Sequence, residues 1–381
     1  MKNLKIMLVF GTRPEAIKMA PVFNALKAKP QKFELKICVT SQHRRMLDQV
    51  LKIFKIKPDI DLNIMKKNQC LTNLTALILK KMKKIFKKYK PDVVLVHGDT
   101  TTSLATSVAA FYHSIPVGHV EAGLRTYNLK APFPEEFNRQ ITSKIAHWHF
   151  TPTILSKKNL LSEGINETAI TVTGNTVIDA LYWVLNQIDQ NTVYKNNLIV
   201  KLKKILKFNF IKDQYILITA HRRENFGNGF LQICSALRQL AKNYPNVHFV
   251  YPVHLNPNVL IPVTKILGKI KNIHLIKPQE YVSFVFLMKH AYFILSDSGG
   301  IQEEAPSLGK PVLLMRDLTE RPEGVKSGTT KLIGSNQSVI VKAVSKILDD
   351  KKYYKSISIS KNPYGDGLAS KRIVNVLSKF I

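Results

Sequence analysis

The stretch IMLVFGTRPEAIKMAPVFNALK (6–27) decides the fold class of this chain. Its first five residues are all apolar, which is typical of a strand covered on both faces in a parallel sheet. A Gly-Thr-Arg-Pro-Glu turn follows, and from Glu15 to Lys27 the apolar residues recur at helical spacing. This strand–turn–helix unit predicts an α/β protein whose first strand ends in a polar turn.

The same alternation continues along the chain and then begins again. Further strands are predicted in the first half at 34–39, 93–96 and 116–120, and in the second half at 215–219, 247–251, 273–276, 292–295 and 311–314. Amphipathic helical stretches lie between them, and a polar, Lys/Asn-rich stretch (191–210) precedes the restart. We therefore expect two doubly wound parallel sheets, with a ligand at the carboxyl ends of the strands in the cleft between the domains.

The domain boundary is expected at Gly174-Asn175, where a strand (170–173) ends and a helix (177–185) begins. The length of 381 residues also fits two domains, because domains commonly hold roughly 100–150 residues.

The formal net charge of +31 first suggests a polyanionic partner such as nucleic acid or a membrane surface. Only 11 of the 57 basic residues are Arg, and the 46 Lys are scattered along amphipathic stretches, as on solvated helix faces. A nucleic-acid-binding protein stays the non-enzyme alternative, but the sequence contains no recognition-helix or aromatic-basic motif.

The apolar runs, the first 15 residues and the cysteines indicate where in the cell the protein is expected. No apolar run approaches the roughly 18 residues of a membrane span, and residues 1–15 lack a signal-peptide pattern. Cys38, Cys70 and Cys234 form no metal-binding spacing, and so sparse a set fits a reducing compartment. We expect a cytoplasmic protein without membrane insertion or a bound metal.

Ionisable residues are concentrated directly after the predicted strands. Six of the 11 arginines fall in these turns, and a rigid guanidinium suits phosphate or carboxylate better than lysine does. Any single residue, such as Asp99 or Ser298, could instead cap the following helix. The arginines of these turns, which together point to an anionic ligand, are Arg13, Arg125, Arg222, Arg223, Arg316 and Arg321.

Several common sites are excluded by the absence of their motifs. The chain has no G-x-G-x-x-G for a nicotinamide dinucleotide and no G-x-x-x-x-G-K-[ST] for a P-loop nucleotide. It also lacks the G-x-S-x-G nucleophile turn of α/β-hydrolases.

Ten motifs together resemble one family, the bacterial non-hydrolysing UDP-N-acetylglucosamine 2-epimerases, from about residue 4 to the C-terminus. Within that family, the likeness is greatest to the enterobacterial members that supply UDP-N-acetylmannosamine for enterobacterial common antigen, a surface polysaccharide. The motifs are FGTRPEAIKMAP (10–21), VHGDTTT (96–102), GHVEAGLRT (118–126), PFPEEFNR (132–139), GNTVIDAL (174–181), AHRREN (220–225), YPVHLNPNV (251–259), SDSGGIQEEAPSLGKPVL (296–313), ERPEG (320–324) and NPYGDG (362–367).

The resemblance implies a GT-B fold of two Rossmann-like domains facing across a cleft. The N-terminal domain would be residues 1–174, and the UDP-binding domain residues 175–367. A C-terminal helix (368–381) would pack back on the first domain, with NPYGDG as the return hinge. Homodimers are usual in the family. The resemblance implies neither NAD nor a metal as cofactor. UDP is retained as an intermediate.

The resemblance also implies roles for individual residues. Lys18, Asp99, Glu121 and Glu135 match positions on the sugar side, and the three carboxylates with His221 form the expected catalytic set. Gln42 and His254 match a region where some relatives bind a second, activating UDP-GlcNAc. The remaining positions expected to bind the nucleotide sugar are Arg13, His221, Gln279, Phe284, Ser298, Gly299, Gly300, Glu304 and Arg321.

The implied reaction inverts C2 by elimination of UDP to 2-acetamidoglucal and re-addition. Carboxylates would serve as base and acid, and Arg13, His221 and the Ser298 turn would stabilise the departing diphosphate. Two enzyme alternatives share these features: a GT-B glycosyltransferase, and a hydrolysing UDP-GlcNAc 2-epimerase that releases free ManNAc.

Overall fold

The computed structural model describes residues 3–41, 44–64, 69–358 and 361–380. The chain divides into two compact units. Unit 1 comprises Met1–Trp183 and Tyr364–Ile381, and unit 2 comprises Val184–Pro363. The division falls within helix α7 (Thr176–Gln190), whereas the sequence analysis places it at the strand end before this helix.

Unit 1 contains a seven-stranded, fully parallel sheet with the order β3-β2-β1-β4-β5-β6-β7. The strands are β1 (Leu4–Phe10), β2 (Phe33–Val39), β3 (Ile60–Asp61), β4 (Val93–His97), β5 (Val117–Val120), β6 (Trp148–Thr151) and β7 (Ile170–Val172). Besides α7, its helices are α1 (Arg13–Lys27), α2 (Arg44–Ile53), α3 (Leu71–Tyr89), α4 (Thr101–Phe111), α5 (Glu135–Ile145), α6 (Ile154–Ser162) and α16 (Ala369–Leu377).

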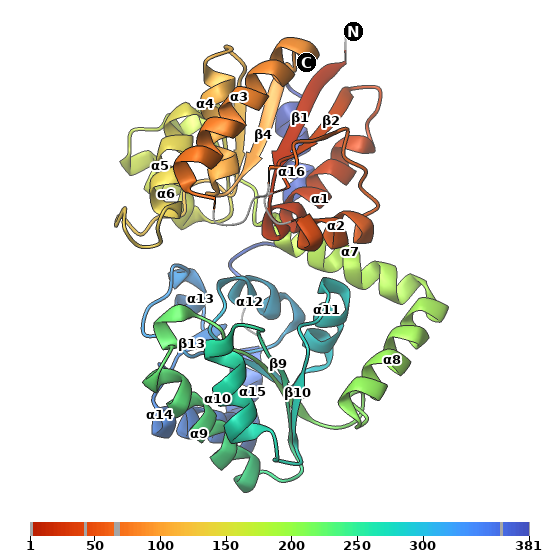
Figure 1. Ribbon diagram of the computed structural model, residues 1–381, viewed down its shortest axis with the longest axis vertical. Coiled ribbons are helices and arrows are strands. Elements are labelled where there is room, and N and C mark those ends of the chain that lie inside the picture. Colours follow the sequence, from red (N-terminus) through yellow and green to blue (C-terminus); the bar gives the residue numbers. More distant parts are fainter. Residues whose placement is uncertain (1–2, 42–43, 65–68, 359–360, 381) are drawn as a thin grey trace. The chain divides into compact units, whose positions relative to one another are not determined.

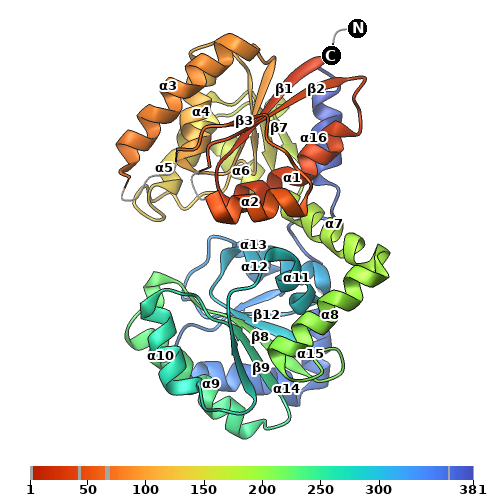
Figure 2. The same ribbon diagram turned by 45° about the vertical axis from the view of Figure 1, so that its right-hand side comes forward.

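Helices cover both faces of this sheet. Figure 1 and Figure 2 show α3 and α4 on one side of β1 and β4, and α1 with the C-terminal helix α16 on the other. Met7 and Val9 of β1 point toward the first side, where they form one buried cluster with Ile78 and Met82 of α3. Burial of each such side chain contributes about 1.5–3 kcal/mol, which explains the near-continuous apolar run of the first strand.

Unit 2 contains a six-stranded parallel sheet with the order β10-β9-β8-β11-β12-β13. The strands are β8 (Tyr215–Thr219), β9 (His248–Pro252), β10 (Ile273–Ile276), β11 (Phe293–Ser296), β12 (Val312–Leu314) and β13 (Thr330–Leu332). Its helices are α8 (Thr192–Leu206), α9 (Asn228–Asn243), α10 (Pro257–Leu267), α11 (Tyr281–His290), α12 (Gly299–Glu304), α13 (Pro322–Lys326), α14 (Gln337–Asp349) and α15 (Lys351–Ser358).

The predicted α/β class with two parallel sheets is confirmed. In each sheet the strand order reverses once, between β1 and β4 in unit 1 and between β8 and β11 in unit 2. The loops after neighbouring strands diverge at such a reversal and leave a crevice at the carboxyl ends, where ligands bind in open α/β sheets. These four strands carry the Gly11, Asp99, His221 and Ser298 turns.

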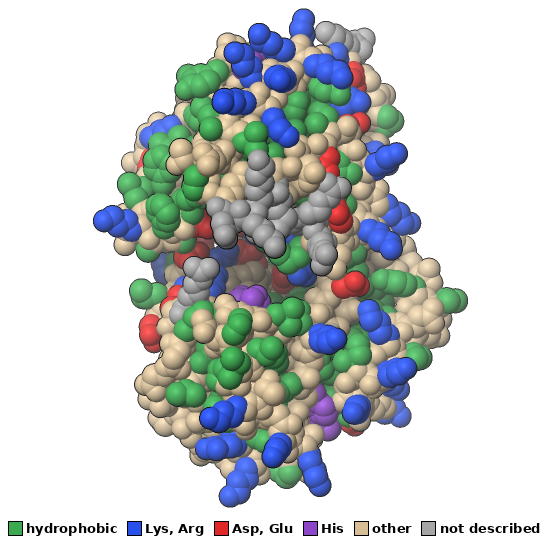
Figure 3. All heavy atoms as spheres, in the orientation of Figure 1, with side chains coloured by type: hydrophobic (Ala, Val, Ile, Leu, Met, Phe, Trp, Pro, Cys, Tyr) green, Lys and Arg blue, Asp and Glu red, His purple; other side chains and the backbone are tan. Residues whose placement is uncertain are grey.

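The basic side chains are dispersed. Figure 3 shows Lys and Arg side chains scattered over the face in view, with neutral and apolar surface between them. Among the described residues on this face, the basic side chains are not gathered into a single patch.

Candidate active site

The Gly-Thr-Arg-Pro-Glu turn is held by its own last residue. The Glu15 carboxylate accepts the backbone N–H groups of Gly11 (3.0 Å) and Thr12 (2.7 Å), and the Thr12 hydroxyl caps α1 in return. This is a capping box. A Cβ on Gly11 would lie 1.9 Å from Oγ1 of Thr40 and 2.7 Å from Oγ1 of Thr102, so a larger residue here would force these side chains to move. Glu15 is thus a structural carboxylate, and the turn is rigid.

Glu121 lies at the centre of a buried polar cluster just after β5. Its Oε1 accepts from Lys18 Nζ (2.5 Å) and from Asn175 Nδ2 (2.9 Å), and its Oε2 lies 2.8 Å from Nε2 of His97. The Glu121 backbone has φ 64, a region that non-glycine residues seldom occupy and that is concentrated at functional sites. The structure thus joins two predicted residues, Lys18 and Glu121, in one ion pair that is almost wholly removed from solvent.

Asp99 lies after the neighbouring strand β4, and its side chain is 29% exposed. Burial raises its pKa to about 6; Arg139, whose Nη1 is 3.5 Å from Oδ2, lowers the pKa, whereas Glu121 and Glu135 raise it. Thr100, not Asp99, caps α4 by accepting the N–H of Ser103. The helix-capping alternative for Asp99 is therefore wrong, because Thr100 occupies that position.

Glu135 and Glu136 begin α5 but differ in role. Glu135 is partly exposed, and its charge reaches Asp99. Glu136 is fully buried and accepts the backbone N–H groups of Thr126 (2.9 Å) and Tyr127 (3.0 Å), and it forms an ion pair with Arg139, whose Nε lies 2.8 Å from Oε2. Glu136 therefore holds the loop after β5, whereas the side chain of Glu135 remains partly exposed.

In unit 2 the turn after β8 is fastened to the end of β11 by Asp297, a residue that the sequence analysis does not single out. Oδ2 of this fully buried carboxylate accepts the backbone N–H groups of His221 (2.8 Å) and Arg222 (2.7 Å). The ring of His221 is 41% exposed, with Nδ1 3.6 Å from Oδ1 of Asp297. Burial lowers the pKa of His221, and the charge of Asp297 raises it. His254 stacks on His221, with ring centroids 5.6 Å apart.

The start of α12 gathers positive charge. Ser298 occupies the N-cap position, and its hydroxyl makes no capping bond within the described residues. A Cβ on Gly299 would lie 2.8 Å from Nη1 of Arg321 and 3.5 Å from Nη2 of Arg222, so both guanidinium groups border this glycine. Backbone N–H groups at a helix start, together with guanidinium groups, are suited to a phosphate. At Gly300 an added Cβ would meet no atom within 4 Å.

The remaining predicted positions in unit 2 lie before and after this turn along the sequence. Glu304 at the end of α12 is buried and accepts the Tyr281 hydroxyl at 2.6 Å. Phe284, on α11, is partly exposed, and Gln279 donates to the carbonyl of Lys277 at 2.7 Å. Arg321 donates to Glu303 at 2.6 Å, which fixes the direction of its guanidinium.

Not all six turn arginines face a ligand. The side chain of Arg125 is fully buried and pairs through Nε and Nη2 with Glu163, at 2.6 and 2.9 Å, and Arg316 pairs with Glu224. These two are structural. Arg13 begins α1 and is partly exposed. Gln42, predicted near an activating site, lies outside the described residues.

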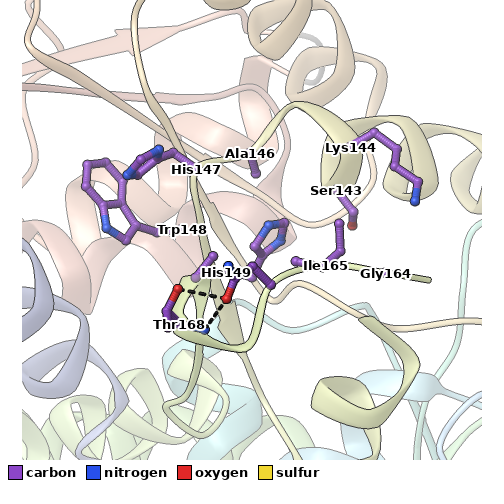
Figure 4. A pocket seen from close by; sticks show the side chains of 11 residues that line it. Ser143, Lys144, Ala146, His147, Trp148, His149, Gly164, Ile165 and Thr168 are labelled. Carbon is purple, nitrogen blue, oxygen red and sulfur yellow. Dashed lines mark hydrogen bonds between the residues drawn. The ribbon is translucent and has the colours of Figure 1, made fainter. Parts of the chain in front are cut away.

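A surface pocket of about 430 Å³ lies elsewhere in unit 1, at the amino end of β6. Figure 4 shows its wall formed by His147, Trp148, His149 and Ile165, from β6 and the loop before β7. Two of its lining residues bind each other, since Oδ1 of Asn166 accepts both the backbone N–H and the hydroxyl of Thr168 at 2.9 Å. None of the predicted site residues lines it.

In the part of the chain that the structure describes, no set of three His, Cys, Asp or Glu side chains is arranged to hold a metal ion. Within the same ranges, no helix combines the length and the apolar character that crossing a membrane requires.

Comparisons with known proteins show the family to which the chain belongs. The UDP-N-acetylglucosamine 2-epimerase family model matches residues 24–378. The UDP-N-acetylglucosamine 2-epimerase of Escherichia coli O157:H7 is 56% identical over 376 residues, covering 98% of each chain.

Two solved structures are also similar. The Neisseria meningitidis UDP-GlcNAc 2-epimerase bound to UDP-GlcNAc has a TM-score of 0.91 at 54% identity, covering 99% of this chain and 100% of that one. The Methanocaldococcus jannaschii enzyme in complex with UDP-GlcNAc and UDP has a TM-score of 0.83 at 35% identity, with the same coverage. The fold is GT-B-like, and the chain belongs to the UDP-N-acetylglucosamine 2-epimerase family.

Proposed function

We propose that the protein interconverts UDP-GlcNAc and UDP-ManNAc without hydrolysing them. The observation that carries this proposal is the set of carboxylates after β4 and β5: Glu121 buried beside Lys18, and Asp99 with a pKa raised to about 6. Inversion at C2 of a sugar without an adjacent carbonyl requires removal of a weakly acidic proton, and carboxylates of this kind can take and return one.

The proposed reaction has two reversible steps. In the first, a carboxylate of unit 1 takes the C2 proton while the C1–O bond to UDP breaks, giving 2-acetamidoglucal and UDP. In the second, the same UDP adds back to C1 and a proton is delivered to the opposite face of C2. The candidates for these proton transfers are Asp99, Glu121 and Glu135. The two steps involve no net oxidation or reduction, so they need no nicotinamide. No metal takes part in either proposed step.

Unit 2 would bind the nucleotide. Arg321, Arg222 and the N–H groups of Ser298 to Gly300 would stabilise the diphosphate as its negative charge grows. His221 would act beside them, because its neutral or protonated ring can donate to a phosphate oxygen. Glu304 suits the ribose hydroxyls and Phe284 the uracil ring, with Gln279 nearby in sequence. In unit 1, the positive charges of Arg13 and Lys18 would offset part of the negative charge of the ligand.

The resemblance also supports finer proposals. We place the protein in the cytoplasm, as a homodimer, in the synthesis of a bacterial surface polysaccharide. We also assign Gln42 and His254 to a second, activating UDP-GlcNAc.

Light scattering of the purified protein tests the dimer: a mass near 43 kDa would refute it. A hyperbolic dependence of rate on UDP-GlcNAc, unchanged in the H254A variant, would refute the activating site.

The reaction is tested by proton NMR of UDP-GlcNAc alone with the protein in D2O. We expect UDP-ManNAc to appear up to an equilibrium mixture, with deuterium incorporated at C2. Free ManNAc together with UDP would instead indicate the hydrolysing reaction. No change until an acceptor sugar is added would indicate a glycosyltransferase.

A further inference from the structure

Asn175 makes contacts to three different parts of unit 1 while only 3% of its surface is exposed. Its Nδ2 donates to Oε1 of Glu121 at 2.9 Å, and its Oδ1 accepts the N–H of Val177 at 3.0 Å, at the start of α7. Its backbone N–H donates to the carbonyl of Tyr364 at 2.7 Å. The carboxamide orientation is defined chemically, because a carboxylate accepts only donors and an N–H requires an acceptor.

The contact to Tyr364 lies where the chain passes itself. Gly174 lies in unit 1 just before α7, the helix in which the chain leaves this unit, and Gly365 follows Tyr364, where the chain returns to it. A Cβ on either glycine would lie 3.3 Å from the Cα of the other, so the two backbones touch. Both glycines have positive φ values, 89° and 132°. Asn175 follows this crossing directly, and its position is therefore set by both segments.

We propose that Asn175 is a positioning residue that fixes the Glu121 carboxylate relative to this chain crossing. The proposal rests on the proposed function, in which Glu121 belongs to the proton-transferring set. Lys18 and Asn175 both bind Oε1, from α1 and from the crossing, so the carboxylate plane is held from two directions. A displacement of about 1 Å in a reacting group can cost about 10²-fold in rate, so the loss of one of these contacts should be measurable.

The test uses two substitutions that keep the helix cap but remove the amide donor. Asp and Ser both accept the N–H bonds of a helix start, so Asn175→Asp and Asn175→Ser should leave α7 intact. We expect kcat to fall by about 10–100-fold in each, with KM for UDP-GlcNAc within about twofold of wild type and an unchanged Tm.

The two variants should differ in pH dependence. In the N175D variant a second carboxylate faces Oε1, and two carboxylates this close share a proton at neutral pH. Its kcat should therefore recover as the pH is raised, whereas that of N175S should not. A purely structural role for Asn175 predicts no such difference.

Asn159 provides the matched control. Its Nδ2 donates to the carbonyl of Gly123, two residues beyond Glu121, without touching that carboxylate. The N159A variant should keep the wild-type kcat. Wild-type kcat in both Asn175 variants, or a fall in kcat explained by a fall in Tm, would overturn the proposal.

Failure of the proposed function itself would show differently, as the absence of C2 exchange in the wild-type protein. In that case a crystal structure of the N175S variant still tests the positioning role. An unchanged Glu121 side-chain orientation in that structure would refute it.

Discussion

Asp297 holds the backbone of His221 with one carboxylate oxygen and faces the ring of His221 with the other. Oδ2 accepts the His221 N–H at 2.8 Å, whereas Oδ1, 3.6 Å from Nδ1, makes no hydrogen bond to any described residue. An unpaired oxygen on a fully buried carboxylate is costly unless it gains a partner. A rotation of the His221 ring that shortens the Nδ1–Oδ1 distance would provide that partner and orient the imidazole.

The Asp297→Asn substitution tests this relationship. The charge of Asp297 raises the pKa of His221, so removing the charge should lower that pKa further. We expect the ring resonances of His221 to titrate at lower pH in D297N than in wild type, as measured by NMR. H254A serves as the comparison with the opposite sign, because His254 lowers the pKa of His221. Equal titration midpoints in D297N and wild type would refute the electrostatic link.

The raised pKa of Asp99 predicts how the reaction rate falls on the acidic side of its pH profile. Only an ionised carboxylate can accept a proton, so exchange at C2 should decline as the pH falls below about 6. Glu135 contributes to raising this pKa, and E135Q should therefore lower the Asp99 titration midpoint in carboxyl-carbon NMR, whatever activity remains. The exposed Glu34 provides a charge-matched control, since E34Q should leave the midpoint unchanged. A wild-type midpoint near 4 would contradict the prediction.

Several buried histidines predict that the protein loses stability in mild acid. Burial lowers the pKa of His119 to about 3, and those of His149 and His274 to about 4, from the ordinary 6.5. Below pH 6.5 the unfolded chain therefore binds protons that the folded protein does not, and stability falls as the pH drops from about 7 to 4. Asp99 and Asp179 oppose this trend, because burial raises the pKa of each carboxyl group.

Thermal unfolding at several pH values measures this effect. We expect Tm to fall steadily between pH 7 and 4.5, and to fall less steeply in H274Q, which removes one of the titrating groups. His274 pairs with His248 at 2.9 Å, so the comparison of variants should use slopes rather than absolute Tm values. A Tm that is constant over this range would rule out the histidine effect.

The long apolar strands and their polar turns could be predicted from sequence because strands covered on both faces read as continuous apolar runs. β6 could not, because its sequence WHFT contains a buried histidine and lacks such a run. β3 has only two residues, too few to show a pattern, and β13 (TKL) has an exposed lysine at its centre and so lacks an apolar run. The Lys/Asn-rich stretch before the restart is mostly the helix α8, in which Leu198, Leu202 and Leu206 form a buried stripe at four-residue spacing.

For the site, sequence reasoning identifies side chains at strand ends but not their partners. Glu121, Asp99 and His221 follow strands directly and could be identified. The contacts of Asp297 and Asn175 depend on long-range folding, since their partners Arg222 and Glu121 are 75 and 54 residues away. A signal for Asp297 did exist, because it also ends a strand, in the SDSGG segment. Nothing local distinguishes Arg125 as a buried structural residue from an arginine that binds a ligand.

We expect the side chain of Asp179 to hold the C-terminal helix α16 in unit 1. Its carboxylate accepts the N–H groups of Ala369 (3.2 Å) and Ser370 (2.8 Å) at the start of α16. D179A leaves these buried donors unpaired, so the free energy of unfolding should fall by about 1–3 kcal/mol, with faster amide exchange in α16. The exposed pair of Asp366 with Arg372 serves as the control, since D366N should change stability by less than about 0.5 kcal/mol. If D179A and D366N unfolded at the same denaturant concentration, Asp179 would not be the residue that fastens α16.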